Sequence, residues 1–327
     1  MKRMLTVTFL MTGVMIFTFL LSLKCGVLTA SWHDVWQIFT APETFPAFIL
    51  RELRLVRAVL ALLSGAALAV SGTILQKVLH NDLASPDILG VSGGAGCAGL
   101  TLMLFCPQYS AFLNTATFAG AMFSAVLIAL AAWKRTLSPI RLILAGVALS
   151  ALFSTACGAM ILLNSDKLTG VMEFTLGGFS RCTMDDLNAA LPFFAASLLL
   201  APLLATRLDV LSLGRDEAAA VGMPVELNRL AALAVAALAA STAVSVAGLL
   251  GFAGLIAPHI AGKLLNTRRT MPLLLLSAVT GAEITLAADL AGRTLFMPRE
   301  VPCGLFLSAF GALFFLILLL QEKEGEL

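Results

Sequence analysis

Long apolar segments, each bounded by charged or turn residues, recur along the whole chain. They fall at residues 4–23, 54–79, 88–106, 111–133, 139–163, 188–206, 229–248, 249–266, 271–292 and 302–320. A helix of about 20 apolar residues is long enough to cross the hydrocarbon core of a bilayer. Because only helices and closed barrels satisfy their backbone hydrogen bonds in lipid, the segments predict an all-α membrane protein with about ten transmembrane helices.

The composition agrees with lipid as the natural solvent. Charged residues make up 12% of the chain, about half the share of about 25% that is usual in soluble domains. The 327 residues leave short loops and no room for a large soluble domain, so we expect a single membrane domain over 1–327. The net charge of +2 gives no indication of a nucleic-acid partner. Lys2 and Arg3 before the first segment imitate a signal peptide, but that segment is near full spanning length, so we expect an uncleaved helix.

The distribution of Lys and Arg predicts the orientation. With the N-terminus inside, thirteen of the 21 basic residues fall on the cytoplasmic side and eight outside. An even number of spans places both termini in the cytoplasm. Three of the outside residues, Arg51, Arg54 and Arg57, lie within one short stretch, which indicates a role other than setting the topology.

The longest predicted cytoplasmic connection spans about 211–226. Ser212 favours a helix start, Asp216–Val221 favours helix, and Gly222 with Pro224 ends it. A short helix between two glycines is a candidate docking element for a cytoplasmic partner, and a solvated amphipathic connector is the equal alternative.

Gly/Pro interruptions follow two segments at comparable places. One covers residues 81–90 after the second segment, and the other covers 251–259 after the seventh. These two segments cross the membrane in opposite directions, so the chain is predicted to consist of two inverted-repeat halves, as in many transporters.

Several motifs resemble enzyme sites without the context that such sites require. Gly94-Ala-Gly96-Cys-Ala-Gly99 fits a dinucleotide pattern but lies inside an apolar segment, where small residues favour close helix packing. A P-loop sequence is absent from the chain, so it is not predicted to hydrolyse ATP. Ser92 lies in a Gly-Val-Ser-Gly sequence that resembles the nucleophile motif of intramembrane serine proteases, and His259 could act as its base. Close helix packing around Ser92 is the favoured interpretation. The cysteines and histidines lack metal-ligand spacing.

Two carboxylates fall inside the ninth segment. Carboxylates at that depth usually face the protein interior or a water-filled cavity. Asp289 has Arg293 four residues later, which predicts an ion pair within one helix. Glu283 either lines a pathway or accepts hydrogen bonds from Thr280 or from another helix, and both possibilities stay open.

Several blocks of sequence resemble one family in its order. Arg54-Leu-Val-Arg57 precedes the segment containing Gly72 and Gln76, and the block from Asn81 to Ala95 follows. The later matching blocks are residues 142–148, 213–214, 220–222, 251–260, 288–289 with Arg293, and 300–304. The set resembles the FecCD family of permeases for iron–siderophores, haem and vitamin B12, and it covers nearly the whole chain. The chain departs from the family pattern at four positions. Prolines are replaced by Val56 and Asp82, an aliphatic residue is replaced by Cys303, and Glu283 occupies a position that is normally apolar.

The resemblance implies a non-enzymatic permease subunit of an ABC importer in the bacterial inner membrane, working as a homodimer by alternating access. Two ATP-binding subunits, which hold ATP and Mg²⁺, dock in the cytoplasm, and a periplasmic or lipid-anchored binding protein docks outside; this chain itself binds no cofactor. The implied docking arginines are Arg54, Arg57 and Arg293. The implied ATPase-coupling residues are Leu213, Gly214, Arg215, Asp216, Glu217 and Gly222. The implied cytoplasmic gate lies near Asn81, Leu83, Pro139 and Ile140.

No motif specifies the cargo. Iron–siderophore chelates are the expected cargo because they account for the largest share of the family, and haem or vitamin B12 is the alternative on the same architecture. An ion-coupled secondary transporter that uses Glu283 and Asp289 is the more distant alternative, since it would need no ATPase.

Overall fold

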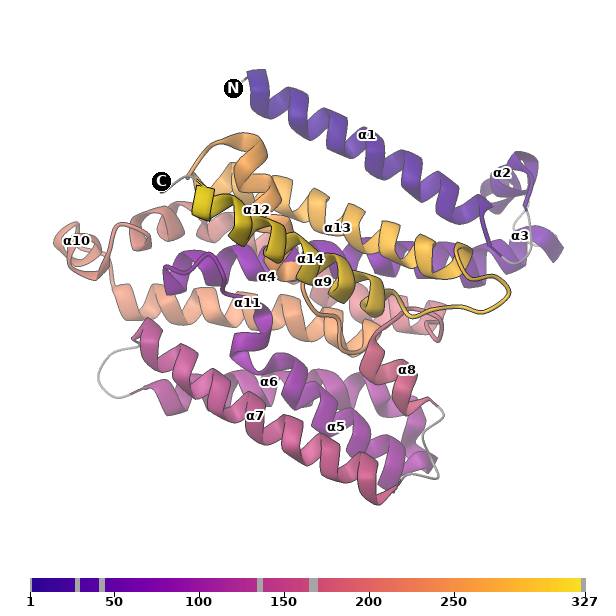
Figure 1. Ribbon diagram of the computed structural model, residues 1–327, viewed down its shortest axis with the longest axis horizontal. Coiled ribbons are helices and arrows are strands. Elements are labelled where there is room, and N and C mark those ends of the chain that lie inside the picture. The colour runs from indigo at the N-terminus through magenta and orange to yellow at the C-terminus, as the bar shows by residue number, and fades with distance from the viewer. Residues whose placement is uncertain (1, 27–29, 41–44, 134–137, 165–169, 325–327) are drawn as a thin grey trace.

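The computed structural model describes residues 2–26, 30–40, 45–133, 138–164 and 170–324. Within these ranges every regular element is a helix. The long helices run back and forth along the long axis of the molecule (Figure 1). The predicted all-α class is therefore confirmed.

Each of the ten predicted segments corresponds to one long helix. These are α1 (Lys2–Lys24), α4 (Val56–Leu79), α5 (Val91–Phe105), α6 (Leu113–Ala132), α7 (Pro139–Leu163), α9 (Met184–Leu211), α11 (Val225–Ala247), α12 (Ala253–Leu265), α13 (Thr270–Thr294) and α14 (Cys303–Glu324). The shorter pieces are α2 (Trp32–Thr40), α3 (Phe45–Ile49), η1 (Leu50–Leu55), η2 (Pro86–Leu89), η3 (Pro107–Phe112), α8 (Val171–Leu176) and α10 (Arg215–Ala220).

Among the described residues, seven helices are long and apolar enough to cross a membrane. Three further apolar helices are shorter, namely Val91–Phe105, Ala253–Leu265 and Cys303–Leu318. The nearly continuous apolar stretch at 229–266 forms two separate helices, α11 and α12, as predicted. The count of ten crossings remains a prediction.

Helix α4 lies at the centre of the bundle and packs against α13, α11 and α12. Small residues make this packing possible. A Cβ added to Gly65 of α4 would collide with the carbonyl oxygen of Gly281 in α13, and one on Gly281 would collide with that of Gly65. The two backbones therefore touch, which is how helices pack closely where lipid supplies no hydrophobic drive.

Helices α1 and α7 lie at the periphery, on opposite edges of the bundle (Figure 1). Buried residues make up 6% of the apolar stretch of α7 and 17% of that of α1. In the span that contains α4 the share is 78%. Most of the exposed side chains of both outer helices are nevertheless apolar, for example Phe17 of α1 and Leu144 of α7. Their outer faces therefore suit lipid or another protein rather than water.

Two breaks in the helical path resemble each other. The first separates α4 from α5, with positive φ at His80 and at Gly90, and the second separates α11 from α12, with positive φ at Gly248 and Phe252. Each break leads into a short helix, α5 of 15 residues or α12 of 13 residues. A Cβ on Gly254 would lie 2.7 Å from Cδ of Pro86, so the two breaks pack against each other. The inverted-repeat arrangement stays a prediction.

The molecule has two distinct ends. The start of α1, the end of α14 and helix α10 lie at one end, and α2 and α3 lie at the other (Figure 1). We call these the α10 end and the arginine end, since Arg54 and Arg57 lie in η1 and at the start of α4, beside α3.

Candidate functional site

The arginine end contains a buried network of charges, here called the arginine cluster (Arg54, Arg57, Asp289, Arg293 and Glu300). Arg57 donates from Nε to Oδ1 of Asp289 at 2.9 Å and to Oδ2 at 3.1 Å. Its Nη1 donates to Oε2 of Glu300 at 2.7 Å. One guanidinium thus joins the last turns of α13 to the loop before α14.

Arg293 approaches the same aspartate from the same helix. Its Nε lies 3.2 Å from Oδ2 of Asp289, and its Nη2 donates to the hydroxyl of Ser22 in α1 at 2.6 Å. The predicted ion pair between Asp289 and Arg293 is confirmed. The Asp289 side chain is 0% exposed and that of Arg293 is 4% exposed, so this aspartate is shared by two cations away from solvent.

Arg54 completes the cluster from η1. Its Nη1 donates to the carbonyl oxygens of Leu23 at 3.0 Å and Lys24 at 2.9 Å. These carbonyls belong to the end of α1, where the last carbonyl groups of a helix have no partner within the helix. Arg54 therefore binds the C-terminus of α1 to the start of the α4 span.

The structure brings all three predicted docking arginines together, and their docking role stays a prediction. In the single chain Arg57 and Arg293 are buried and paired with Asp289. Burial in a poorly solvated site favours pairing, because an unpaired buried charge is very costly. Glu300, with 40% of its side chain exposed, was not singled out from the sequence. Its place in the 300–304 block was the available signal.

The 211–226 connection forms the predicted short helix between two glycines. Helix α10 starts after Gly214 and is followed by Gly222, and both glycines have positive φ, 123° and 81°. L-residues with side chains rarely adopt this conformation. Ala218 of α10 is buried, while Leu213 and Val221 on either side of it are exposed. The helix is thus seated on the bundle and presents apolar side chains outward.

The remaining coupling residues frame α10. Arg215 lies 3.6 Å from Glu226, measured from Nη2 to Oε1. Asp216 and Glu217 occupy the first turn of the helix, where acidic side chains interact favourably with the helix dipole.

A hydrogen bond links this connection to the first break. Nε2 of His80 lies 3.0 Å from the carbonyl oxygen of Leu211. His80 ends α4 and Leu211 ends α9, so the α10 connection and the break after α4 start from one hydrogen-bonded junction. This contact could not be predicted from the sequence, because the two residues are 131 positions apart.

The predicted gate residues lie at the starts of the first break and of α7. Asn81 Oδ1 accepts a hydrogen bond from the backbone N–H of Leu83 at 2.9 Å, which turns the chain after α4. Pro139 is the first residue of α7. Leu83 and Ile140 are large apolar residues that are 59% and 69% exposed in the single chain.

Glu283 faces α1. Its Oε1 accepts a hydrogen bond from the hydroxyl of Thr18 at 2.8 Å, whereas Thr280 donates to a carbonyl of its own helix. Of the two sequence-based possibilities, the hydrogen bond from another helix is present. A pathway-lining role for Glu283 remains untested.

The hydroxyl of Ser92 donates to the carboxylate of Asp87. The ring of His259 instead packs edge-on against Phe314, with centroids 5.7 Å apart. This arrangement does not support the nucleophile–base pair that the protease hypothesis requires. Among the described residues, no group of three or more His, Cys, Asp or Glu side chains could hold a metal ion.

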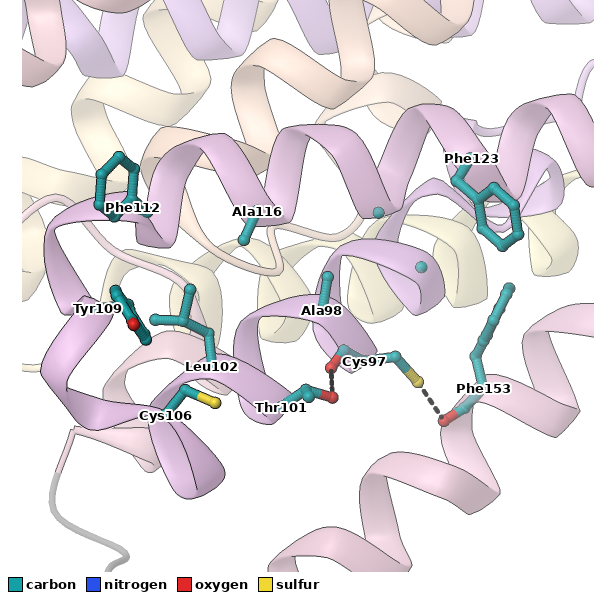
Figure 2. A pocket seen from close by; sticks show the side chains of 12 residues that line it. Cys97, Ala98, Thr101, Leu102, Cys106, Tyr109, Phe112, Ala116, Phe123 and Phe153 are labelled. Carbon is teal, nitrogen blue, oxygen red and sulfur yellow. Dashed lines mark hydrogen bonds between the residues drawn. The ribbon is translucent and has the colours of Figure 1, made fainter.

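A cleft of about 650 Å³, which the sequence did not predict, lies between α5, α6 and α7. Figure 2 shows Cys97 of α5 directed at Phe153 of α7, with Thr101 farther along α5 and Tyr109 and Phe112 at the far end. Its lining residues are uncharged; Thr101 donates to the Cys97 carbonyl at 2.7 Å, and Cys97 Sγ lies 3.4 Å from the Phe153 carbonyl. The cleft therefore offers a mainly apolar surface.

Comparison with known proteins places the chain among transport proteins. It matches the FecCD transport family over residues 14–321. It is 33% identical to the Fe(3+)-citrate import system permease protein YfmE of Bacillus subtilis, over 99% of this chain and 98% of that protein. It is 31% identical to the ferric enterobactin transport system permease protein FepG of Escherichia coli, over 99% and 98%. A solved structure described as an inward-facing conformation of a metal-chelate type ABC transporter has a TM-score of 0.84 and 28% identity, covering 97% of this chain and 99% of that one.

Proposed function

Because this chain belongs to the FecCD transport family, we propose that it is the permease subunit of a binding-protein-dependent ABC importer for iron–siderophore chelates. The observation that carries the proposal is the family match over residues 14–321, which takes in helices from α1 to α14. The chain is a multi-pass membrane protein of the bacterial inner membrane. Family membership gives it a transport role rather than a catalytic one.

The cargo follows from the relatives. Those compared above are named for ferric citrate and ferric enterobactin, and a third, 35% identical, is an iron(3+)-hydroxamate permease of Bacillus subtilis. These cargoes differ in chemistry but share Fe(3+) held by an organic chelator. Iron–siderophore chelates are therefore favoured over haem or vitamin B12.

The permease crosses the membrane about ten times with both termini and α10 in the cytoplasm. Two copies face each other through α7, with cargo passing between them. The exposed residues Ile140, Leu144 and Val147 support this arrangement, since their spacing puts them on one helical face. The gate residues Leu83 and Ile140 then meet their counterparts near the cytoplasmic side.

ATP-binding subunits dock on α10. Its exposed apolar flanks, Leu213 and Val221, suit burial in a partner. The hydrogen bond from His80 to Leu211 gives a direct path for movement, because displacing the end of α9 displaces the break that leads into α5. ATP binding in the partners would thus alternate the access of the pathway between the two sides.

The binding protein docks at the arginine end. Three arginines against two carboxylates leave the cluster with an excess positive charge, which attracts acidic groups on a partner. Arg54 is half-buried, whereas Arg57 and Arg293 are buried. Arg54 is therefore the arginine that a partner reaches first, and the other two add positive charge behind it. Contact with glutamates of the binding protein would compete with Asp289 and Glu300 for the same guanidinium groups.

The proposal is tested by purifying the complex from native membranes, reconstituting it in vesicles and measuring uptake of radioactive iron. We expect an ATP-binding subunit to co-purify and a non-hydrolysable ATP analogue to stop uptake. Iron–siderophores should compete for uptake, whereas haem and vitamin B12 should not. Uptake driven by a proton gradient alone and abolished by Glu283→Gln would instead establish a secondary transporter.

A further inference from the structure

The three tryptophans of the chain all lie at the ends of spanning helices or beside them. Trp32 and Trp36 belong to α2, which follows α1 at the arginine end, and Trp133 caps α6. Tryptophan concentrates where bilayer and water meet, because its ring is apolar and its indole N–H is polar. The positions of these residues therefore bear on where the bilayer ends.

Helix α2 has two apolar faces with different neighbours. Val35 and Ile38 are 5% and 4% exposed and belong to the main hydrophobic core. Trp32 and Trp36, one helical turn apart on another face, are 52% and 67% exposed. Ser31 and Asp34 cap the start of the helix through reciprocal hydrogen bonds of 2.8 and 3.1 Å. The helix is thus fixed on the protein, and its tryptophans are directed away from it.

The exposed aromatic face continues onto neighbouring elements. Helix α2 packs against α3 and η1, where Phe48 and Leu53 are 55% and 61% exposed. Cations accompany this surface: Nζ of Lys24 lies 4.7 Å from the centroid of the Trp32 ring, and Arg51 is exposed. Such a mixture of large apolar side chains and cations matches the boundary between acyl chains and phosphate headgroups.

The surface is also continuous with a helix that faces lipid. Helix α1 exposes Phe9, Phe17 and Leu20 along its length and ends at Lys24, the residue that contacts Trp32. Figure 1 shows α1 and α2 on the edge of the bundle opposite α7. A second copy seated on α7 would leave α2 uncovered, so the bilayer is the occupant that fits best.

We propose that α2 is an interfacial anchor that lies in the headgroup boundary of the leaflet at the arginine end, with Trp32 and Trp36 inserted among the upper acyl chains. Lys24 and Arg51 then lie at the level of the lipid phosphates. This inference rests on the chain's being a membrane protein and is independent of its cargo.

The anchor fixes the depth of the arginine cluster. Arg54 donates to the backbone carbonyl of Lys24, the residue whose side chain lies at the phosphate level. The arginine cluster therefore lies close to the lipid headgroups. Trp133, at the far end of α6, then marks the opposite boundary. The 20 residues of α6 span about 30 Å at 1.5 Å per residue, which equals the hydrocarbon thickness.

Depth-dependent fluorescence quenching tests the proposal. The Trp133→Phe variant retains only Trp32 and Trp36, and it is reconstituted in vesicles of phosphatidylcholine and phosphatidylglycerol. The phosphatidylcholine carries bromine either near the headgroup or near the end of its acyl chains. For an anchor that lies about 5–10 Å below the surface, the shallow bromines should quench at least about twofold more than the deep ones. The full three-tryptophan chain should show the same preference.

One control variant accompanies this test, and two outcomes would overturn the proposal. The double variant Trp32→Phe/Trp36→Phe, which reports Trp133 alone, should also prefer the shallow label but should respond to bromolipid placed in the other leaflet. Strong quenching of Trp32 and Trp36 by aqueous iodide, without quenching by bromolipid, would overturn the proposal in favour of a solvent-exposed helix. Insensitivity to both quenchers would overturn it in favour of coverage by protein, either a second copy or a bound partner.

Discussion

The two ends of this molecule use charge in opposite ways. At the arginine end, Arg57 and Arg293 share the fully buried Asp289, and the cluster joins α1, α4 and α13 to the loop before α14. At the α10 end, Arg215, Asp216 and Glu217 lie on a six-residue helix held between two glycines, and the Arg215 side chain, which pairs with Glu226, is 50% exposed. Removing charge should therefore threaten the fold at the first end and only function at the second.

The largest effect on stability is expected from removing the charge of Asp289, which pairs with both Arg57 and Arg293. Asp289→Asn keeps the shape of the side chain but leaves the buried Arg293 without its carboxylate and Arg57 with Glu300 alone. Removing one partner of a buried pair typically costs about 3–5 kcal/mol, so we expect a large fall in the thermal unfolding midpoint of the detergent-solubilised protein.

Glu300→Gln is the matched control for that change, because the Glu300 side chain is 40% exposed. It should cost much less. An unchanged unfolding midpoint in Asp289→Asn would show that the cluster does not stabilise the fold. Charge reversal at Arg293 should fail in the same way as Asp289→Asn, since it would place a second carboxylate beside Asp289. This differs from what an exposed docking residue would show.

Deleting Asp216–Val221 should abolish uptake and the association with an ATPase while leaving insertion and the unfolding midpoint nearly unchanged. The reason is that α10 packs on the bundle mainly through Ala218. Uptake assays and co-purification measure the first effect, and thermal unfolding measures the second. The milder variant Leu213→Ser should weaken ATPase association with no change in unfolding. Normal uptake by the deletion variant would remove α10 from the coupling mechanism.

The hydrogen bond between the α10 connection and the break after α4 is expected to give a smaller effect. His80→Phe removes the donor to the Leu211 carbonyl, a hydrogen bond with a net contribution of about 0.5–1.5 kcal/mol. We expect modest destabilisation but a several-fold rise in ATP hydrolysed per iron chelate imported. If that ratio stays at the value of the unmodified protein, the junction is structural only.

Arg54→Ala should have a modest effect on docking. An exposed ion pair contributes about 0–1 kcal/mol, so the affinity for the binding protein should fall by up to about fivefold and depend less on salt. Measurements at two ionic strengths check both expectations. A loss of stability comparable to that of Asp289→Asn would mean that the bonds of Arg54 to α1 are its main role.

The smallest effect is expected at Ser92. Its hydroxyl bonds to Asp87 within one turn-and-helix unit, and the neighbouring helices pack through glycines. Ser92→Ala should therefore retain most transport, measured as initial uptake rate. Loss of a proteolytic activity in this variant, with transport intact, would revive the enzyme hypothesis.

Local sequence signals were enough for the helices and for several contacts within them. The apolar segments, the separation of α11 from α12, the short helix between Gly214 and Gly222, and the pair Asp289–Arg293 are all governed by neighbours within a few residues. Helix formation, capping and i, i+4 pairing depend on such short separations. The sequence was therefore sufficient for them.

Only the tertiary structure decided how the charges are used. The sequence placed Arg57 and Arg293 on the outer side of the membrane, but it did not indicate that Arg57 bonds to Asp289 across 232 residues or Arg293 to Ser22 across 271. The contacts of His80 with Leu211 and Glu283 with Thr18 likewise join distant segments. Burial and pairing are set by which helices pack together, and in a bundle that packing depends on close contacts such as Gly65 against Gly281. Residue spacing along one chain cannot specify these contacts.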